Sequence, residues 1–281
     1  MMRTIHRVGI IVKKDSAKAA TIARELQDWL AERAVQVAMD AIVPELDMLV
    51  VLGGDGTLLH IAAQASKYGI PVMGVNMGSL GFLTEVAEEE RFAALEKVLA
   101  GEVTLEERMM FKTRLVGPGG TSAWRHALND VVISKGTIDR LVHLCTWANH
   151  HYIASYKADG LIFSTPTGST AYNLSAGGPI VHPAMTSILV TPICPFMLES
   201  RPVLLPGDTL LTARLTGHAR DVKVIVDGQP AWDMKEKDNL EIVAGERRLQ
   251  LICSPWEGYF DILRNKLNWG GRPEDIPGKE G

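Results

Sequence analysis

The sequence predicts an α/β domain with a parallel sheet, followed by a second domain made mainly of β-strands. In the first third of the chain, apolar runs typical of strands alternate with amphipathic segments of helical spacing. From about residue 105 the helical spacing ends, and short alternating runs are separated by turn residues. Strands that alternate with helices predict a parallel sheet, whereas closely spaced strands predict a layered β-sandwich.

The first domain should have a Rossmann-like succession of elements. We expect strands at 8–12, 48–52 and 70–75, and helices at 16–33, 57–68 and 88–100. Gly101 should end the last helix, because glycine readily adopts the left-handed conformation at a helix C-terminus. In such sheets ligands bind beyond the carboxyl ends of the strands. Asp55 and Asn76 each follow such an end.

The second domain should consist of short strands. The expected strands are 131–134, 141–147, 161–164, 210–215, 222–226 and 249–253, with glycine-rich or proline-rich turns between them. The boundary between the two domains is therefore expected near residue 105.

Composition restricts the classes of protein to consider. The chain has 281 residues, 46% hydrophobic and 22% charged, which suits one large or two modest globular domains. A formal charge of −4 argues against non-specific nucleic-acid binding. No apolar run approaches the ~20 residues needed to span a bilayer, and the three cysteines have no metal-type spacing. We expect a soluble, cytoplasmic protein with reduced thiols, no membrane partner and no structural metal.

The segment most informative about chemistry is Gly53-Gly54-Asp55-Gly56-Thr57, directly after the apolar run 48–52. Glycines let a ligand approach the backbone, and their N–H groups with the following helix N-terminus can bind phosphate oxygens. The segment is neither a Walker A loop, which needs a lysine, nor the dinucleotide fingerprint. An aspartate there repels phosphate unless a metal ion or a removable proton is near. The simpler alternative is a strand-to-helix turn with Asp55 as the helix N-cap.

Three further segments are candidates for the same site. The loop 76–84 follows a strand and carries Phe82, although its apolar residues could simply fill the core. Asn129 and Asp130 precede a strand and could hydrogen-bond a ribose diol or a base edge, although such pairs are usually turns. The stretch 159–173 holds five hydroxyl residues between Ser164 and Thr170, which could bind an amide or a sugar without adding charge.

Together these segments resemble the NAD kinases. The glycine-rich segment resembles a signature shared with diacylglycerol kinases and 6-phosphofructokinases, and the stretch 159–181 resembles a segment diagnostic of NAD kinases. The resemblance continues through 191–195, 227–229 and 259–270, in family order, so the chain is identified as a member of the bacterial-type NAD kinases. The resemblance implies that the tail 260–281 joins the first domain, 1–105, and leaves 106–259 as the NAD-binding β domain.

The resemblance also implies a role for each site residue. Asp55 would be the general base that takes the proton from the 2′-hydroxyl of the adenosine ribose. Gly53, Gly54, Gly56 and Thr57 would hold phosphates, and Phe82 would lie against adenine. The remaining residues implied to contact the dinucleotide or to bound its pockets are His60, Asn129, Asp130, Arg140, Lys157, Asp159, Thr167, Thr170, Ala171, Tyr172, Asn173, Leu174, Ser175 and Gln229.

The implied reaction is transfer of the γ-phosphoryl group of ATP to NAD, giving NADP. No P-loop lysine is present, so a divalent ion such as Mg²⁺, carried with ATP, would supply positive charge. The resemblance further implies a homodimer or homotetramer whose pockets a neighbouring subunit helps to complete. The chain departs from the family pattern at Lys157, Phe196 and Asp130, where arginine, histidine and glutamate are common.

Two other functions remain open. A lipid or sugar kinase of the wider group would share the glycine-rich segment, but the stretch 159–172 argues against it. A non-catalytic nucleotide-sensing protein would keep the fold, but the intact Asp55 argues against loss of catalysis.

Overall fold

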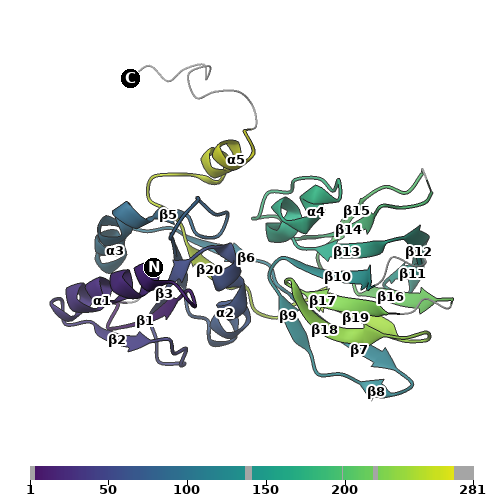
Figure 1. Cartoon of the computed structure of the whole chain (residues 1–281), viewed down its shortest axis with the longest axis horizontal. Helices are drawn as coiled ribbons and strands as arrows, with labels where there is room; N and C mark the ends of the chain where they lie inside the picture. Colours follow the sequence, from purple (N-terminus) through teal and green to yellow (C-terminus); the bar gives the residue numbers. More distant parts are fainter. Residues whose placement is uncertain (1–3, 137–140, 198, 218–220, 269–281) are drawn as a thin grey trace. The chain divides into compact units, whose positions relative to one another are not determined.

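The computed structural model describes residues 4–136, 141–197, 199–217 and 221–268. The chain divides into two compact units (Figure 1). Unit 1 comprises Met1–Glu106 and Leu249–Gly281, and unit 2 comprises Glu107–Arg248. The chain therefore returns to unit 1 with a strand that begins at Leu249, earlier than the expected tail at residue 260, because that strand pairs inside the sheet of unit 1.

Unit 1 is built on a seven-stranded sheet. Its strand order is β2-β1-β3-β4-β20-β6, with β5 on β4. The strands are β1 (Arg7–Val12), β2 (Gln36–Met39), β3 (Met48–Gly53), β4 (Val72–Asn76), β5 (Val86–Ala87), β6 (Leu105–Arg108) and β20 (Leu249–Ile252). The pairs β1·β2, β1·β3, β3·β4, β4·β5 and β4·β20 are all parallel. The predicted α/β class of this unit is confirmed.

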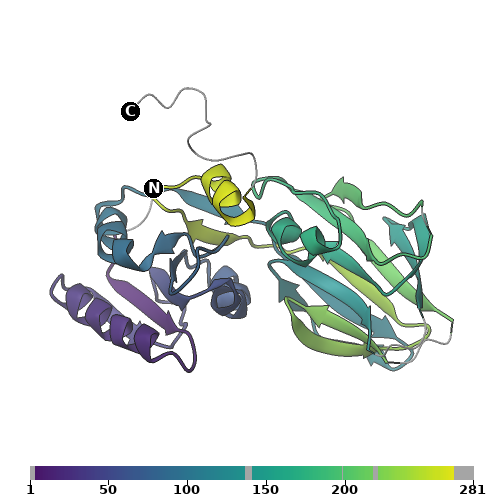
Figure 2. The same cartoon turned by 45° about the horizontal axis from the view of Figure 1, so that its top comes forward.

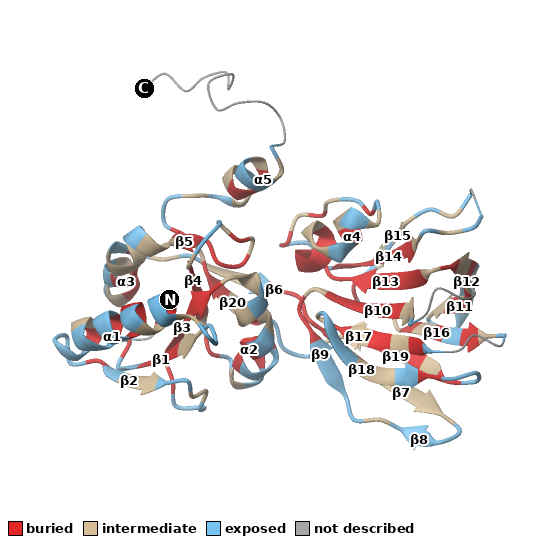
Figure 3. Ribbon diagram, in the orientation of Figure 1, coloured by how far each residue is buried: buried red, intermediate tan, exposed pale blue. Residues whose placement is uncertain are grey.

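Helices cover both faces of this sheet (Figure 2). Buried residues of α1 (Ala17–Ala31) and α3 (Arg91–Ala100) pack with Met48, Val50 and Leu52 of β3. The alternate residues of β3 point to the opposite face, where α2 (Asp55–Tyr68) contacts β3, β4 and β20. All six residues of β3 are buried, as expected for a central parallel strand (Figure 3).

The helix ends follow local sequence rules. Ser16 caps α1 by accepting a hydrogen bond from the N–H of Ala19 at 3.2 Å. α2 and α3 end at Gly69 and Gly101, which have φ of 67° and 74°. These left-handed C-caps favour glycine, so the expected end of α3 at Gly101 is confirmed. A single 3₁₀ turn, Glu88–Glu90, leads into α3, and α5 (Tyr259–Leu267) is the last described helix.

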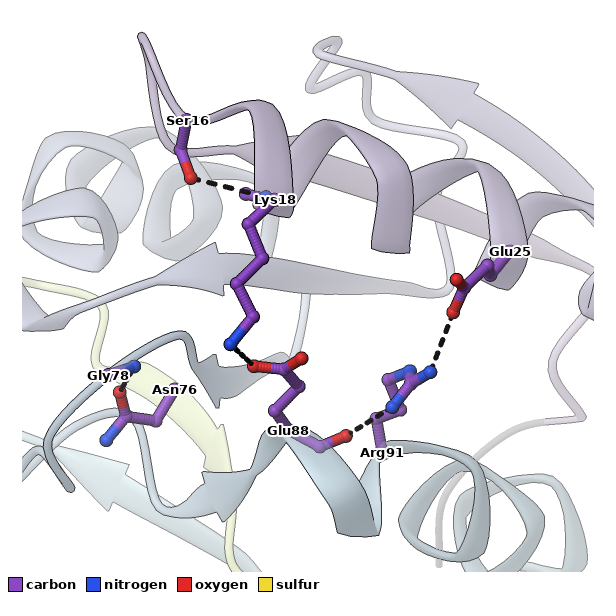
Figure 4. Close-up of polar contacts among 8 residues, drawn as sticks. Ser16, Lys18, Glu25, Asn76, Gly78, Glu88 and Arg91 are labelled. Carbon is purple, nitrogen blue, oxygen red and sulfur yellow. Dashed lines mark hydrogen bonds and ion pairs between the residues drawn. The ribbon is translucent and has the colours of Figure 1, made fainter.

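Ion pairs join α1 to the start of α3 (Figure 4). Lys18 pairs with Glu88, and Arg91 Nη2 lies 2.7 Å from Glu25 Oε2. Arg91 also donates to the carbonyl of Glu88 at 2.7 Å. Pairs on a wet surface typically contribute only about 0–1 kcal/mol each, so the apolar faces of both helices hold them on the sheet.

Unit 2 is a sandwich of two antiparallel sheets. One has the order β15-β14-β13-β10-β17-β18, and the other has the order β12-β11-β16-β19-β7-β8 with β9 on β7. The strands are β7 (Phe111–Gly117), β8 (Gly120–Thr121), β9 (Arg125–Ala127), β10 (Asp130–Lys135), β11 (Val142–Ala148), β12 (His151–Ala158), β13 (Gly160–Ser164), β14 (Ser187–Ile193), β15 (Val203–Pro206), β16 (Leu211–Thr216), β17 (Val222–Val226), β18 (Gln229–Met234) and β19 (Asn239–Ala244).

One apolar core lies between these sheets. It includes Phe163 and Val190 from the first sheet and Phe111, Leu144 and Ile242 from the second, all fully buried. The predicted layered β class is therefore confirmed for unit 2. Two short helical turns, η2 (Thr167–Thr170) and α4 (Tyr172–Ser175), follow β13.

Within the part of the chain that the structure describes, no helix is both long and apolar enough to cross a membrane.

Candidate functional site

The glycine-rich segment joins β3 to α2 at the carboxyl edge of the unit 1 sheet. Gly53, the last residue of β3, lies opposite Asn76, the last residue of β4. Asn76 Oδ1 accepts a hydrogen bond from the N–H of Gly78 at 2.7 Å, which turns the chain into the loop 77–84 (Figure 4). Gly54 is the N-cap of α2 and Asp55 is its first residue, without a side-chain cap. The alternative role for Asp55, capping the helix, is therefore absent here.

The Asp55 carboxylate is bound by the loop that follows β4. Its Oδ2 accepts from the N–H of Phe82 at 2.9 Å. Its Oδ1 accepts from the N–H groups of Leu83 and Thr84, both at 3.1 Å, and from Thr84 Oγ1 at 3.0 Å. Three consecutive backbone N–H groups thus surround one carboxylate and fix its orientation.

Because of these bonds, the two carboxylate oxygens differ in how many further hydrogen bonds they can accept. A carboxylate can accept about four hydrogen bonds, roughly two at each oxygen. Oδ1 already has three donors, whereas Oδ2 has one. Oδ2 is therefore the oxygen of Asp55 that can take a further proton or donor. Asp55 itself is only partly buried, so that oxygen can be reached.

Gly81 allows the loop 82–84 to lie within hydrogen-bond distance of the Asp55 carboxylate. A Cβ placed on Gly81 would lie 2.0 Å from Asp55 Oδ1 and 2.2 Å from Thr84 Oγ1. No side chain fits at such distances, so any larger residue would push the carboxylate away from its donors. Gly78 in the same loop has open space, because a Cβ placed there would have no neighbour within 4 Å.

The glycines beside Asp55 also differ in the space that a side chain would have. At Gly53 a Cβ would meet Thr57 Oγ1 at 2.4 Å, so packing within the protein requires glycine. At Gly54 and Gly56 it would meet nothing within 4 Å, and neither residue needs a left-handed φ. The fold therefore does not account for these two glycines, whereas the close approach of a ligand to their backbone would.

The C-terminal helix reaches the same loop. Lys266 of α5 donates from Nζ to the carbonyl of Leu80 at 2.6 Å, and its Nζ lies 5.6 Å from the centroid of the Phe82 ring. Phe82 is partly buried. His60 lies on α2, one turn beyond the glycine segment, and is exposed.

In unit 2 a second group of predicted residues lies at the start of β10. The N–H groups of Leu128, Asn129 and Asp130 all donate to the carboxylate of Asp227, at 2.7, 2.8 and 3.1 Å. Asp227 follows β17, which pairs with β10. Three consecutive N–H groups again surround one aspartate.

The stretch after β13 binds the carbonyls of the same residues. Thr165 Oγ1 donates to the carbonyl of Leu128 at 2.5 Å, and the N–H of Thr165 donates to the carbonyl of Asn129 at 2.9 Å. A Cβ on Gly168 would lie 2.2 Å from that second carbonyl. The structure thus brings Asn129 and Asp130 together with the hydroxyl-rich stretch, as the sequence led us to expect of one site.

Asp130 is a buried carboxyl with no hydrogen bond to its side chain among the described residues. Only 6% of its surface is exposed. Burial, and secondarily the charge of Asp227, raises the pKa of Asp130 to about 7. Burial also raises the pKa of Asp227, against the lowering effect of its three N–H donors. The Asn129 side chain, partly buried, likewise has no partner among the described residues.

The rest of the hydroxyl-rich stretch is heterogeneous. Thr167 Oγ1 is buried without a hydrogen-bond partner in the described structure. Asn173 is fully buried: its Nδ2 donates to the carbonyls of Ser169 and Pro179, and its Oδ1 accepts from Thr191. Those bonds tie α4 to β14, so contact of Asn173 with a ligand stays a prediction. Tyr172 and Ser175 are exposed, and Thr170, Ala171 and Leu174 are partly buried.

Two predicted residues lie at the other end of the β10–β13 pair. Asp130 pairs with Ser164 at one end and Ser134 with Gly160 at the other. Asp159 therefore lies a strand length away from Asp130, and its carboxylate is 2.5 Å from Lys135 Nζ. Lys157 Nζ lies 4.7 Å from the centroid of Phe196, so two positions that depart from the family pattern contact each other. Gln229 is exposed at the start of β18, and Arg140 lies outside the described residues.

Sequence reasoning did not single out Thr84, Asp227 or Lys266. Thr84 contacts Asp55 from 29 positions away, Asp227 contacts Leu128 across 99 positions, and Lys266 contacts Leu80 across 186. Only Asp227 carried a local signal, because Asp-Gly is a common hairpin turn. Nothing in the sequence around Asp227 indicated that it would contact Leu128.

Comparison with known proteins identifies the family. The profile of the ATP-NAD kinase N-terminal domain matches residues 42–103, and that of the ATP-NAD kinase C-terminal domain matches residues 128–254. The NAD kinase of Geotalea daltonii is 41% identical, covering 95% of this chain and 100% of its own length. That of Geobacter metallireducens is 42% identical, with coverage of 95% and 100%.

Solved structures share the fold. A crystal structure of yeast NADH kinase complexed with NADH has a TM-score of 0.88 at 24% identity, covering 96% of this chain and 89% of that one. The NAD kinase from Archaeoglobus fulgidus in complex with ATP has a TM-score of 0.76 at 23% identity, with coverage of 94% and 100%. With relatives at about 40% identity over nearly the full length and two family profiles along the sequence, the chain belongs to the NAD kinase family.

Proposed function

We propose that this chain is an NAD kinase, which transfers the γ-phosphoryl group of ATP to the 2′-hydroxyl of the adenosine ribose of NAD, giving NADP. The observation that carries the proposal is the Asp55 carboxylate, which is held by four donors beside open glycines and can accept one further hydrogen bond at Oδ2. A carboxylate so placed suits proton removal from a hydroxyl nucleophile during phosphoryl transfer.

Asp55 is the general base in this proposal, acting through Oδ2. A ribose hydroxyl is a very weak acid, so its proton is best removed as the phosphoryl group arrives. The N–H groups of residues 82–84 keep the carboxylate from turning away, which reduces the reorganisation needed at the moment of reaction. Phe82, in the same loop, lies against the adenine ring in this proposal.

The phosphates of the nucleotides lie on the open backbone at Gly54 and Gly56. These residues, at the first turn of α2, combine room for a ligand with the positive end of a helix. Phosphoryl transfer needs positive charge as well, and this segment has no lysine. We infer that Mg²⁺ enters with ATP as part of that substrate. Among the described residues, no three His, Cys, Asp or Glu side chains are placed to hold a metal ion.

Residues of unit 2 bind the nucleosides of NAD. The side chains of Asn129 and Asp130 have no hydrogen-bond partner among the described residues. The buried Thr167 hydroxyl also lacks a partner within the described part of the chain. Ribose hydroxyls and the nicotinamide amide can satisfy such groups. Lys157 and Asp159 lie a strand length away, which is compatible with a homodimer or homotetramer in which they serve a neighbouring copy.

A lipid or sugar kinase remains the alternative enzyme, but no feature of the described site favours it. The polar side chains of Asn129, Asp130 and Thr167 suit a nucleoside rather than an acyl chain. A nucleotide-sensing protein without catalysis would not require Gly81, which serves to seat the Asp55 carboxylate.

The first prediction tests the reaction itself. Purified protein given ATP, Mg²⁺ and NAD should form NADP, measured with an NADP-specific dehydrogenase. Asp55→Asn should lower kcat by roughly 10²–10⁴, because it removes the base, while KM for NAD changes little. Asn keeps Oδ1 as the acceptor for Leu83 and Thr84, and loses only the hydrogen bond from the N–H of Phe82 to Oδ2.

Asp47→Asn is the matched control for that variant. Asp47 Oδ2 also accepts backbone N–H groups in unit 1, from His6 and Arg7, both at 2.8 Å, but it lies outside the glycine-rich segment. This control should keep kcat within about twofold. Phosphorylation of diacylglycerol or a sugar, with no NADP formed, would select the alternative enzyme. An unchanged kcat for Asp55→Asn would show that another group is the base.

A second prediction concerns Gly81. Gly81→Ala places a methyl group 2.0 Å from Asp55 Oδ1, so the carboxylate must move and kcat should fall by about 10²-fold or more. Gly78→Ala, in the same loop but with open space around it, should have a far smaller effect. Equal kcat values for the two variants, with equal melting temperatures, would refute the role of Gly81 in positioning the Asp55 carboxylate.

A third prediction follows from the buried Asp130. Its pKa is raised from 3.8 to about 7, so the native protein retains a proton that the unfolded chain releases between these values. Stability from this group is complete below the unfolded pKa and is lost as pH rises through about 7. Asp130→Asn cannot ionise, so it should raise the free energy of unfolding at pH 8 by about 2–4 kcal/mol relative to its effect at pH 4.

The measurement is urea unfolding of both proteins from pH 4 to pH 8, with KM for NAD determined alongside. The same substitution should weaken NAD binding, because a neutral amide replaces the carboxylate that accepts ribose hydroxyl groups. A stability difference that stays constant over this pH range would mean that Asp130 titrates normally.

A further inference from the structure

Asp227 occupies the hairpin between β17 and β18. Val226 pairs with Gln229, so Asp227 and Gly228 form a two-residue turn, with φ of 45° and 75°. Turns with positive φ at both central residues favour Asn-Gly and Asp-Gly. Turn preference alone would therefore explain an aspartate at this position.

The carboxylate of Asp227 does more than the turn requires. Its two oxygens accept the N–H groups of Leu128, Asn129 and Asp130, which lie where the chain leaves β9 and enters β10. Its own N–H donates to the carbonyl of Asp130 at 3.0 Å. Asparagine would suit the turn equally well, but its amide nitrogen could not accept an N–H group.

Together with the stretch 164–165, Asp227 pairs every backbone polar group of residues 128–130. The three N–H groups bind its carboxylate, and the carbonyls bind Thr165 Oγ1, Thr165 N–H and the N–H of Asp227. The backbone of these residues is thereby fixed without help from the side chains of Asn129 and Asp130. Those side chains have no hydrogen-bond partner among the described residues.

We propose that Asp227 is a positioning residue for NAD: its carboxylate fixes the backbone of residues 128–130, so that Asn129 and Asp130 present their side chains to the dinucleotide. Asp227 acts through these residues and does not itself contact the reacting atoms. This inference rests on the proposed NAD kinase function, which assigns the ligand to this site.

The charge of Asp227 has a second consequence. Among the described residues it is the charged group that acts on Asp130, and its effect adds to burial in raising the pKa of Asp130. Ser164 of β13, which pairs with Asp130, is uncharged. Removing the charge of Asp227 should therefore lower the pKa of Asp130, whereas a purely structural change of the turn should not.

The variant to test is Asp227→Asn in the full-length protein. Asparagine tolerates the positive φ and retains one acceptor oxygen, so the hairpin should form. KM for NAD should rise about tenfold, the effect expected when hydrogen bonds to a charged acceptor are lost. KM for ATP should change less than twofold. The pH at which KM for NAD begins to rise on acidification should move to lower values.

Asp238→Asn is the matched control. Asp238 is a buried turn aspartate of unit 2 that accepts the N–H of Lys235 at 2.8 Å, with no bond to residues 128–130. It should leave KM for NAD and its pH profile unchanged even where it lowers the melting temperature. Equal changes in both variants would overturn the proposal, because Asp227 would then be a turn residue only.

Hydrogen–deuterium exchange in the full-length protein, read from the fragment that covers residues 125–135, tests this inference independently of the proposed function. Asp227→Asn should increase exchange at 128–130 by at least tenfold, whether or not the wild type forms NADP. A wild type that forms no NADP, with faster exchange in the variant, would refute the function but keep the link between Asp227 and residues 128–130. Unchanged exchange would overturn the inference regardless of activity.

Discussion

The hydrogen bonding of the Asp55 carboxylate by the loop 82–84 is the interaction on which the candidate site depends. The parallel sheet places the ends of β3 and β4 side by side, and each end turns into a segment that contains glycines. Gly81 lets the second loop approach the first closely enough for three backbone N–H groups to converge on one side chain. One carboxylate oxygen is saturated by these donors, and the other keeps capacity for chemistry.

Unit 2 contains the same arrangement of three consecutive backbone N–H groups around one aspartate. Asp227 is surrounded by the N–H groups of residues 128–130, as Asp55 is by those of residues 82–84. In unit 1 the backbone orients a carboxylate that we propose as the general base. In unit 2 a carboxylate orients the backbone beside two side chains that we propose to bind NAD. Burial raises the pKa of Asp130, so ionisation of this carboxyl lowers the stability of the folded state.

Local pattern was enough to predict the class of both units and the order of the motifs. The 48–52 strand, the glycine segment and the Gly101 helix end follow rules that act over a few residues, and the structure has them. Strands such as β2, β12 and β18 were not anticipated, because exposed or mixed residues give them little alternation. The contacts that orient Asp55 and Asn129 could not be predicted, because their partners lie tens of residues away and have ordinary sequence surroundings.

A crystal structure of the protein with NAD bound would test the central claim most directly. The distance to measure joins Oδ2 of Asp55 to the 2′-oxygen of the adenosine ribose. The account predicts about 2.6–3.2 Å, or one bridging water, with the N–H groups of residues 82–84 still on the carboxylate. A 2′-oxygen beyond the reach of Asp55, or a carboxylate released from that loop and turned away from the ribose, would contradict it.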